Sequence, residues 1–448
     1  MRKLFPLFLL LMICRLDSIA QYTLWSIGSA NDTITSPTPC TLLMGGATED
    51  DQAMTKFLQY ADHGDIVVIR TSGADGYNTY LYSDLGVQVN SVQTILIPSI
   101  ADANDSFVVQ TVRNAEALWI AGGDQWTYVS NWKNTALNAA INHLINVRHV
   151  PVGGTSAGMA IMSEFYNSAQ GGSAQSPVVL ANPYDPTVTI GSSDFLHNSF
   201  LNDMITDTHF DYYNRQGRLM TFIARAWKDS NRKINAIACD EYTGVFIDTN
   251  YKATVFGGKP SADDNAYFLR VDCAGNNAIE SCVSGTPLNW KQDSTVVKVY
   301  KIQSDSSGTQ YFDLRNFGTN PTYTNNGGTW QDWWVNQGTF NFKPGTALLC
   351  TPLTLLDEEE STLRVTVSPN PFYSSVQLEL NLSAAASLRW VVSDMAGRIV
   401  LISGGFKKYQ KGYTGQTIEF NSPLRQGVYV LEIQNESGES IIHRLIKQ

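Results

Sequence analysis

The sequence predicts an α/β protein with a parallel sheet, continued by a β-rich region and then by a small all-β sandwich. Three observations carry this prediction. Up to about Phe256, short and nearly continuous apolar runs alternate with amphipathic stretches, the pattern of buried parallel strands joined by helices. Beyond Phe256, strand-like runs are separated by turns rich in Gly, Asn and Thr. From Leu363 onward, short alternating strands follow one another, as in a sandwich.

Length and composition restrict the classes of protein that remain. A chain of 448 residues is long enough for two or three domains with a sizeable core. Charged residues make up 16% and aromatic residues 11%, which is typical of a globular chain. The formal net charge of −10 does not favour nucleic acid or an anionic membrane as a partner.

The first residues have the pattern of a targeting segment. Arg2 and Lys3 precede an apolar run over residues 4–14, and Ser18-Ile19-Ala20 forms a small-residue cleavage site. The apolar run is too short to span a bilayer. We expect a signal peptide over residues 1–20 and an exported mature protein.

The cysteines indicate disulfide chemistry rather than a metal site. Of six cysteines, only Cys14 precedes the predicted cleavage site, and export permits the others to form disulfides. Cys273 and Cys282 are close enough in sequence to close a short loop, whereas Cys239 lies in an apolar run and is expected to be buried. No Cys-x-x-Cys pair or histidine cluster is present, so we expect neither a metal nor a cofactor.

The expected elements of the α/β part follow in order. Strands are predicted over residues 41–44, 66–70, 94–98, 117–121, from 150, and later over 236–239 and 245–248, with helices over 50–61 and 134–146. Small residues follow four strands, at Gly45-Gly46, Ser72-Gly73, Gly122-Gly123 and Ser156. Because the carboxyl ends of parallel strands meet at one edge, where ligands bind, this edge is the candidate site.

The β-rich region contains an aromatic cluster. Strands are predicted over residues 268–271, 296–300 and 310–314, and Trp330, Trp333 and Trp334 follow them. The tryptophans could form a platform for a sugar or a peptide. We favour the other interpretation, in which they are the hydrophobic cover of a β element.

Ser156 is the candidate nucleophile. Residues 154–158 match G-x-S-x-G, a sharp strand-to-helix turn that exposes a serine hydroxyl above a sheet. The glycines permit backbone angles that a side chain would block. The N–H of Ala157 would face a developing oxyanion. The motif is common, and an ordinary Gly-rich turn is the alternative.

A nucleophilic serine needs a base and a third group that orients the base. His209 stands in a polar segment before Arg215 and Arg218, which are three residues apart and so share one face of a helix. Two guanidinium groups suit a ligand that bears a carboxylate. Asp240-Glu241 follows a strand directly, and either carboxylate could orient the histidine. His197 stays a second candidate for the base.

Four motifs, in order, resemble the cyanophycinase and dipeptidase E family of serine peptidases (family S51). They are residues 119–125 (Trp-Ile-Ala-Gly-Gly-Asp-Gln), 153–158, 207–210 with the two arginines that follow, and 238–241. The resemblance runs from about Thr41 to Phe256. It implies a fold like that of class I glutamine amidotransferases, which is flavodoxin-like.

The resemblance also implies roles. Ser156 would be the nucleophile, His209 the general base and Glu241 the orienting acid. The N–H groups of Gly123 and Ala157 would form the oxyanion hole, and Gln125, Asp207, Arg215 and Arg218 would bind the substrate. One departure is Thr208, which replaces a glutamine of the cyanophycinases and puts use of a β-aspartyl-arginine polymer in doubt.

The final part of the chain resembles the C-terminal sorting domain of the type IX secretion system. The resemblance rests on Pro369-Asn370-Pro371, on the Asp-x-x-Gly-Arg turn at 394–398 and on the Gly-x-Tyr strand at 427–431. It implies export across the outer membrane to the cell surface or the medium, with the secretion machinery as partner. The expected organisation is a signal peptide at 1–20, a peptidase domain at 21–356 with a β-rich extension at about 257–356, an acidic linker at 357–362 and the sorting domain at 363–448.

Together these features predict an exported serine peptidase that hydrolyses Asp-containing peptides. The first alternative is a non-catalytic surface or binding protein on the same fold. A thiol amidotransferase is disfavoured, because the motif carries Ser156 instead of a cysteine. The expected partners are a peptide substrate and the secretion machinery, without nucleic acid, and a homodimer is left open.

Overall fold

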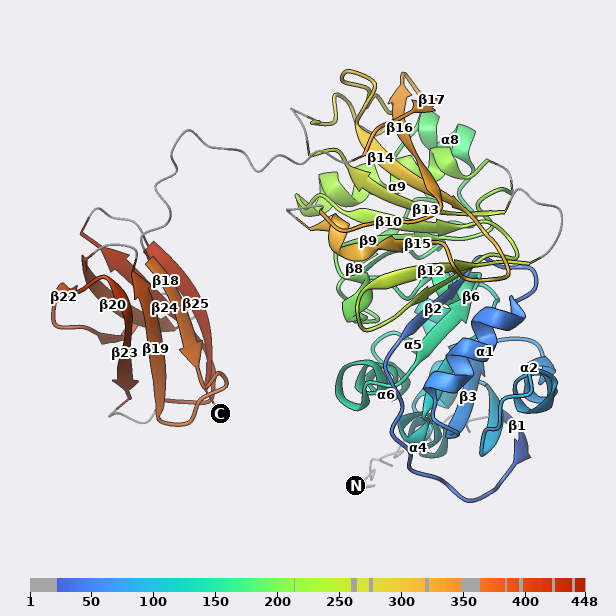
Figure 1. The fold of residues 1–448 in the computed structure, drawn as a ribbon, viewed down its shortest axis with the longest axis horizontal. Helices are drawn as coiled ribbons and strands as arrows, with labels where there is room; N and C mark the ends of the chain where they lie inside the picture. Colours follow the sequence, from blue (N-terminus) through green and yellow to red (C-terminus); the bar gives the residue numbers. More distant parts are fainter. Residues whose placement is uncertain are drawn as a thin grey trace, which may run out of the picture. The chain divides into compact units, whose positions relative to one another are not determined.

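The computed structural model describes ten stretches of the chain. They are residues 22–212, 214–258, 264–273, 277–318, 322–347, 363–382, 385–394, 398–420, 424–436 and 440–447. The chain divides into two compact units between Thr351 and Pro352, and each unit is described by itself (Figure 1). The predicted signal peptide and acidic linker lie outside the described residues. Within those residues, we find no helix long and apolar enough to cross a membrane.

The first sheet has a parallel centre. Its five central strands are, in spatial order, β4 (Ser91–Leu96), β3 (Asp65–Arg70), β5 (Ala117–Ile120), β6 (Val152–Thr155) and β2 (Thr41–Met44). Most residues of these strands are buried, which explains their nearly continuous apolar runs. The edges are antiparallel: β1 (Thr23–Gly28) pairs with β4, and β11 (Gly244–Ile247), β12 (Lys252–Phe256) and β15 (Tyr311–Asp313) continue from β2. The predicted parallel sheet is confirmed.

Helices connect the parallel strands. The longer ones are α1 (Asp51–Tyr60), α4 (Ser106–Asn114), α5 (Gln125–Trp132) and α6 (Ala136–His143). Side chains cap their first turns; Asp50, for example, accepts hydrogen bonds from the backbone N–H groups of Gln52 and Ala53. The helix predicted over residues 134–146 is shorter as a regular α-helix and continues as a π-helical turn over Leu144–Arg148.

A second sheet of eight strands forms the rest of this unit (Figure 1). Its spatial order is β17 (Thr339–Pro344), β16 (Gly328–Asn336), β14 (Val297–Gln303), β13 (Asn265–Val271), β10 (Asn235–Cys239), β9 (Met204–Asp207), β7 (Phe165–Asn167) and β8 (Ile190–Ser192). The strands β9 and β10 are parallel, whereas β13 to β17 are antiparallel. The β-rich region is therefore built into both sheets, since β15 completes the first one and the other strands extend β10.

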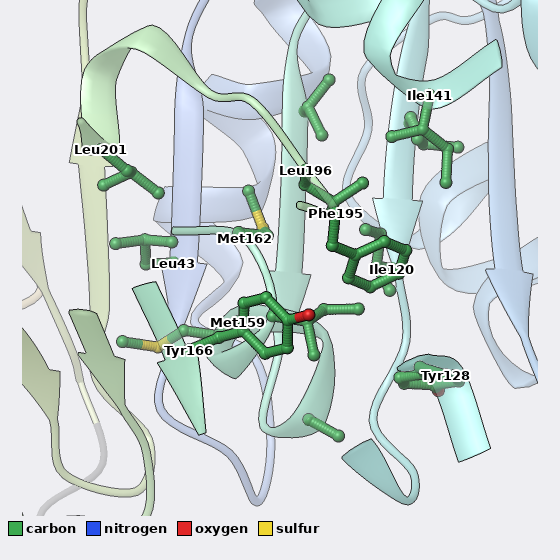
Figure 2. Close-up of a cluster of buried hydrophobic side chains, with 14 of the residues drawn as sticks. Leu43, Ile120, Tyr128, Ile141, Met159, Met162, Tyr166, Phe195, Leu196 and Leu201 are labelled. Atoms are coloured by element: carbon green, nitrogen blue, oxygen red, sulfur yellow. The ribbon is translucent and has the colours of Figure 1, made fainter. Parts of the chain in front are cut away.

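The core lies against both faces of the first sheet. Figure 2 shows part of it: Met159 and Met162, which directly follow the Ser156 turn, lie in one buried cluster with Leu43 and Ile120. The turn that carries the candidate nucleophile is thus anchored in the core.

The tryptophans of the β-rich region cover the second sheet. Trp333 is 2% exposed and packs between Phe210 and Phe340, at ring-centroid distances of 6.2 and 5.1 Å. Trp330 packs on Tyr300 at 4.9 Å. This arrangement agrees with a hydrophobic cover and not with a platform for a ligand.

The predicted disulfide between Cys273 and Cys282 is wrong. Cys282 is a free, buried thiol, and Cys273 is disulfide-bonded to another cysteine. Cys282 belongs to the apolar cluster of the second sheet, with Leu288 and Trp290, and burial raises the pKa of its thiol to about 11. Cys239 is buried and free in β10, as expected.

The second unit is a small sandwich of two sheets. One contains β18 (Leu363–Ser368), β19 (Ser375–Leu382) and β23 (Gly412–Glu419), and the other β21 (Ile399–Ile402), β20 (Ala386–Asp394), β24 (Gly427–Asn435) and β25 (Ser440–Lys447), with β22 (Lys407–Tyr409) beside β20. Asn370 ties the opening turn to β25, because its side chain donates to the carbonyl of Arg444 and accepts from the N–H of Ile446. The all-β prediction is confirmed.

Candidate active site

The turn at Ser156 has the strained geometry that its motif predicts. Ser156 has φ 52° and ψ −117°, between β6 and the short helix α7 (Ala157–Ala160). A non-glycine residue adopts such angles only when its surroundings enforce them. Gly158 lets the turn approach β5, since a Cβ on it would lie 2.1 Å from the carbonyl oxygen of Ile120. The serine hydroxyl is thereby held at the carboxyl end of the parallel strands.

A chain of hydrogen bonds joins three predicted residues. The Oγ atom of Ser156 lies 2.7 Å from Nε2 of His209, and Nδ1 of His209 lies 2.6 Å from Oε1 of Glu241. The side chains of His209 and Glu241 are 24% and 25% exposed. Ser156 follows a strand of the first sheet, whereas His209 and Glu241 follow β9 and β10 of the second. The arrangement is therefore assembled from both sheets.

The side chain of Asp240, the neighbour of Glu241, bonds to Asn265 instead of to His209. Its Oδ2 atom accepts from the backbone N–H of Asn265 at 2.8 Å, and its side chain is buried. Burial and the nearby charge of Asp211 raise the pKa of Asp240 to about 8. Of the two carboxylates that the sequence left open, Glu241 is the one that contacts His209. His197 is exposed and its backbone bonds to Asn142, away from Ser156.

The end of β2 and the loop that follows it are hydrogen-bonded to the segments around Ser156, His209 and Glu241. The carbonyl groups of Met44, Gly45 and Gly46 accept the backbone N–H groups of Ser156, His209 and Tyr242, at 3.0, 2.8 and 3.0 Å. Tyr242 directly follows Glu241. Three consecutive peptide groups thus fix the backbone around the serine, the imidazole and the carboxylate.

Two backbone N–H groups are available beside Ser156. Those of Gly123 and Ala157 donate to no other residue in the described stretches. The loop of Gly123 lies next to the serine, since a Cβ on Gly122 would be 3.5 Å from the Cβ of Ser156. The hydroxyl of Tyr128 holds this loop by donating to the carbonyl of Gly122. Such free donors are what an oxyanion requires.

Two predicted substrate ligands face each other. Asp207 and Arg218 are 2% and 6% exposed and form an ion pair, in which Nε of Arg218 lies 3.0 Å from Oδ2 of Asp207. The second contact of the pair joins Nη2 to Oδ1. A bidentate pair of this kind satisfies both buried charges.

Arg215 and Gln125 are placed differently. Arg215 is half-buried, and its Nη1 atom donates to the carbonyl of Thr208 at 2.7 Å. Burial, and then the charge of Arg218, lower the pKa of Arg215 to about 10. Within the described stretches Arg215 has no ion-pair partner, and the charges of Asp207, Glu241 and Asp211 partly oppose the lowering of its pKa. Gln125 begins α5, and its Nε2 atom donates to the carbonyl of Asn167 at 2.9 Å.

Two carboxylates near the site were not predicted. Asp211 accepts the backbone N–H of Glu241 at 2.9 Å. Glu49 lies in the loop after β2, where its Oε1 atom accepts a hydrogen bond from the hydroxyl of Tyr77. The sequence feature that could have identified Glu49 is its position shortly after a predicted parallel strand. In the described stretches, no His, Cys, Asp and Glu side chains gather in a group that could hold a metal ion.

Comparisons with known proteins agree with the two resemblances. Residues 74–226 match the model of peptidase family S51, and residues 366–448 match that of the secretion system C-terminal sorting domain. A cyanophycinase of Synechococcus elongatus is 28% identical over 193 residues, which is 41% of this chain and 56% of that protein. A cyanophycinase of Geminocystis herdmanii is 23% identical over 245 residues, 50% of this chain and 85% of that protein. The chain thus spans little more than half the length of the first of these curated relatives.

A solved structure described as a peptidase from an acI-B1 Actinobacterium covers 52% of this chain and 91% of its own, at 13% identity and a TM-score of 0.37. This TM-score is too low for any conclusion to be drawn from the likeness. The family matches support a peptidase and a sorting tail. The resemblance read from the motifs is confirmed: residues 74–226 carry the pattern of peptidase family S51, and residues 366–448 carry that of the secretion system C-terminal sorting domain.

Proposed function

We propose that this chain is a serine peptidase that cleaves Asp-containing peptides through an acyl-enzyme. The observation that carries the proposal is the continuous set of hydrogen bonds from Ser156 through His209 to Glu241. Nε2 of His209 takes the hydroxyl proton as Oγ attacks the carbonyl carbon of the substrate. Glu241 orients the imidazole and stabilises the imidazolium that forms.

The C–N bond of the substrate then breaks, and His209 passes the proton to the leaving amine. Water, activated by the same imidazole, hydrolyses the ester on Ser156 and regenerates the hydroxyl. In both steps the N–H groups of Gly123 and Ala157 stabilise the oxyanion. Loss of one such donor typically lowers kcat by about 10²- to 10³-fold.

The guanidinium of Arg215, which forms no ion pair within the described stretches, supports an acidic substrate. We assign to its guanidinium the carboxylate of an aspartyl residue, because charge-assisted bidentate contacts are strong and directional. We also assign Gln125 to the binding of the substrate. The Asp207–Arg218 pair contributes indirectly, by stabilising the structure next to Arg215. The relatives named cyanophycinase make a β-aspartyl-arginine peptide one substrate to test, although Thr208 replaces the family's glutamine.

The finer points of organisation belong to the same proposal. The peptidase domain spans residues 21–356 on a class I glutamine amidotransferase-like fold, after a signal peptide at 1–20 and before an acidic linker at 357–362. The sorting domain at 363–448 directs export by the type IX machinery to the cell surface or the medium. The sorting-domain match supports this route.

The test is hydrolysis of β-aspartyl-arginine polymer and of a panel of α- and β-aspartyl dipeptides by the full chain. Ser156→Ala removes the nucleophile, and Ser106→Ala, at an exposed serine that begins α4, is the matched control. We expect release of products by the parent and the control but not by Ser156→Ala. A parent that folds but cleaves nothing would favour the non-catalytic binding protein.

A further inference from the structure

Glu49 is a half-buried carboxyl group that the proposed chemistry does not use. It lies three residues after Gly46, and its Oε1 atom accepts the hydroxyl of Tyr77. The side chain of Thr155, the last residue of β6, is among the groups that act to lower the pKa of Glu49. Because Thr155 directly precedes Ser156, the side chain of Glu49 lies close to the nucleophile turn.

This loop is also hydrogen-bonded to the segments that contain the other two members of the triad. Its carbonyl groups at Gly45 and Gly46 accept the backbone N–H groups of His209 and Tyr242. The loop itself is tight, with positive φ angles of 127° at Gly46 and 63° at Ala47. Beyond Glu49 the chain enters α1, whose first turn is capped by Asp50. A shift of the loop would therefore move the imidazole and the carboxylate relative to the serine.

Tyr77, the hydrogen-bond partner of Glu49, packs against the strands next to Ser156. The ring of Tyr77 packs against Trp119 in β5, at a centroid distance of 6.3 Å. Trp119 is fully buried, and it fills the space over Gly153 in β6, where a Cβ would lie 2.5 Å from its ring. Glu49, Tyr77, Trp119 and Gly153 thus form a continuous path from the loop to β6, the strand that leads to Ser156.

We propose that Glu49 is a positioning residue, which through its bond to Tyr77 holds residues 45–49 against β5 and β6 and so keeps His209 and Glu241 aligned with Ser156. This inference rests on the proposed function, since alignment matters only if Ser156 is the nucleophile. Burial raises the pKa of Glu49, and hydrogen bonds to its carboxyl oppose that shift. Those bonds, rather than an ion pair within the described stretches, hold the side chain.

The chain offers a matched control. The hydroxyl of Tyr80 donates to Oδ1 of Asp51 at 2.9 Å, between the same two parts of the chain as the Tyr77–Glu49 pair. Asp51 is exposed and makes no contact with Thr155. Asp51→Ala therefore removes a tyrosine–carboxylate bond of the same kind without loosening the nucleophile turn.

The experiment compares Glu49→Ala, Glu49→Gln and Asp51→Ala in the full chain. It measures kcat and KM on a peptide that the parent cleaves, the rate at which diisopropyl fluorophosphate labels Ser156, and the thermal unfolding temperature. We expect Glu49→Ala to lower kcat and the labelling rate about 10- to 100-fold at unchanged KM, as misplacement by a fraction of an ångström does. Glu49→Gln keeps an acceptor for Tyr77 and should recover most of the loss, and Asp51→Ala should lose nothing.

Three results would overturn the inference. The first is an equal loss in Glu49→Ala and Asp51→Ala, which would mark a general effect of stability. The second is an unchanged labelling rate in folded Glu49→Ala, and the third is a rise in KM at unchanged kcat. A parent that is neither active nor labelled would overturn the proposed function itself, whereas a parent that is labelled but cleaves none of the peptides leaves the comparison intact.

Discussion

The α-carbon of Gly46 lies against the imidazole of His209, so closely that a Cβ at this position would be 2.2 Å from Cε1 of the ring. Gly46 also has φ 127°, a conformation that other residues rarely adopt. The absence of a side chain at Gly46 is thus a condition for the position of the ring.

Gly46→Ala is the direct test of this packing. The new methyl group should displace the ring from Ser156 and lower kcat at least about 100-fold, because catalysis depends on geometry at this scale. Gly86→Ala is the control, since Gly86 also has a positive φ but open space around it. Steady-state kinetics of both variants, with unfolding curves, checks the prediction, and equal kinetics for the two would contradict it.

Glu241→Gln should separate the two neighbouring carboxylates. It removes the charge that stabilises the imidazolium of His209, so we expect kcat to fall about 10²- to 10⁴-fold with little change in stability. Asp240→Asn, one residue away, should keep kcat within about threefold, because its side chain bonds to Asn265. The reverse order of effects in a kcat comparison would reassign the orienting role.

The stability of the peptidase unit should fall with pH because of Asp240. Its folded pKa of about 8 lies far above the unfolded value of about 3.9. Between these values the unfolded state has lost the proton that the folded state keeps, so the free energy of unfolding decreases as the pH rises from about 4 to 8. Asp240→Asn does not titrate and should lose this slope, which is at most about 1.4 kcal/mol per pH unit. Denaturant unfolding at several pH values compares the two, and parallel profiles would rule out this assignment.

Arg215, which directly precedes the helix α9 (Gln216–Ser230), and Arg218 in its first turn should respond differently to substitution. Arg218→Ala leaves Asp207 buried without its partner and should cost about 3–5 kcal/mol of stability. Arg215→Ala should leave stability nearly unchanged but raise KM for an aspartyl peptide about 10-fold or more, because it removes a charge-assisted contact to the substrate. Kinetics and denaturant unfolding of both variants test this, and a shared loss of stability without a change in KM would refute it.

Much of the architecture is readable from the sequence, since strands buried on both faces need nearly continuous apolar residues. The G-x-S-x-G turn can also be predicted from the local sequence alone, because the backbone of the turn requires its glycines. Which sheet a strand joins is not local: β10 has an apolar run like that of β5, yet it pairs with β9 in the second sheet. The candidate site also depends on this long-range pairing, because Ser156 follows a strand of the first sheet, whereas His209 and Glu241 follow strands of the second.

Long-range contacts account for what the sequence did not reveal. The proposed role of Glu49 depends on its hydrogen bond to Tyr77, which is 28 residues away. Asp240 and Glu241 are chemically alike and adjacent, so only the fold decides which one reaches His209. Cys273 and Cys282 are close in sequence, but Cys282 is directed into an apolar cluster.

The division of the triad between two sheets has a consequence for the timing of activity. Ser156 comes from the first sheet, His209 and Glu241 come from the second, and the loop after β2 joins them. Neither sheet alone contains a nucleophile with its base. The proposed hydrolase would therefore be inactive until both sheets have folded, and completed folding would be its activation step.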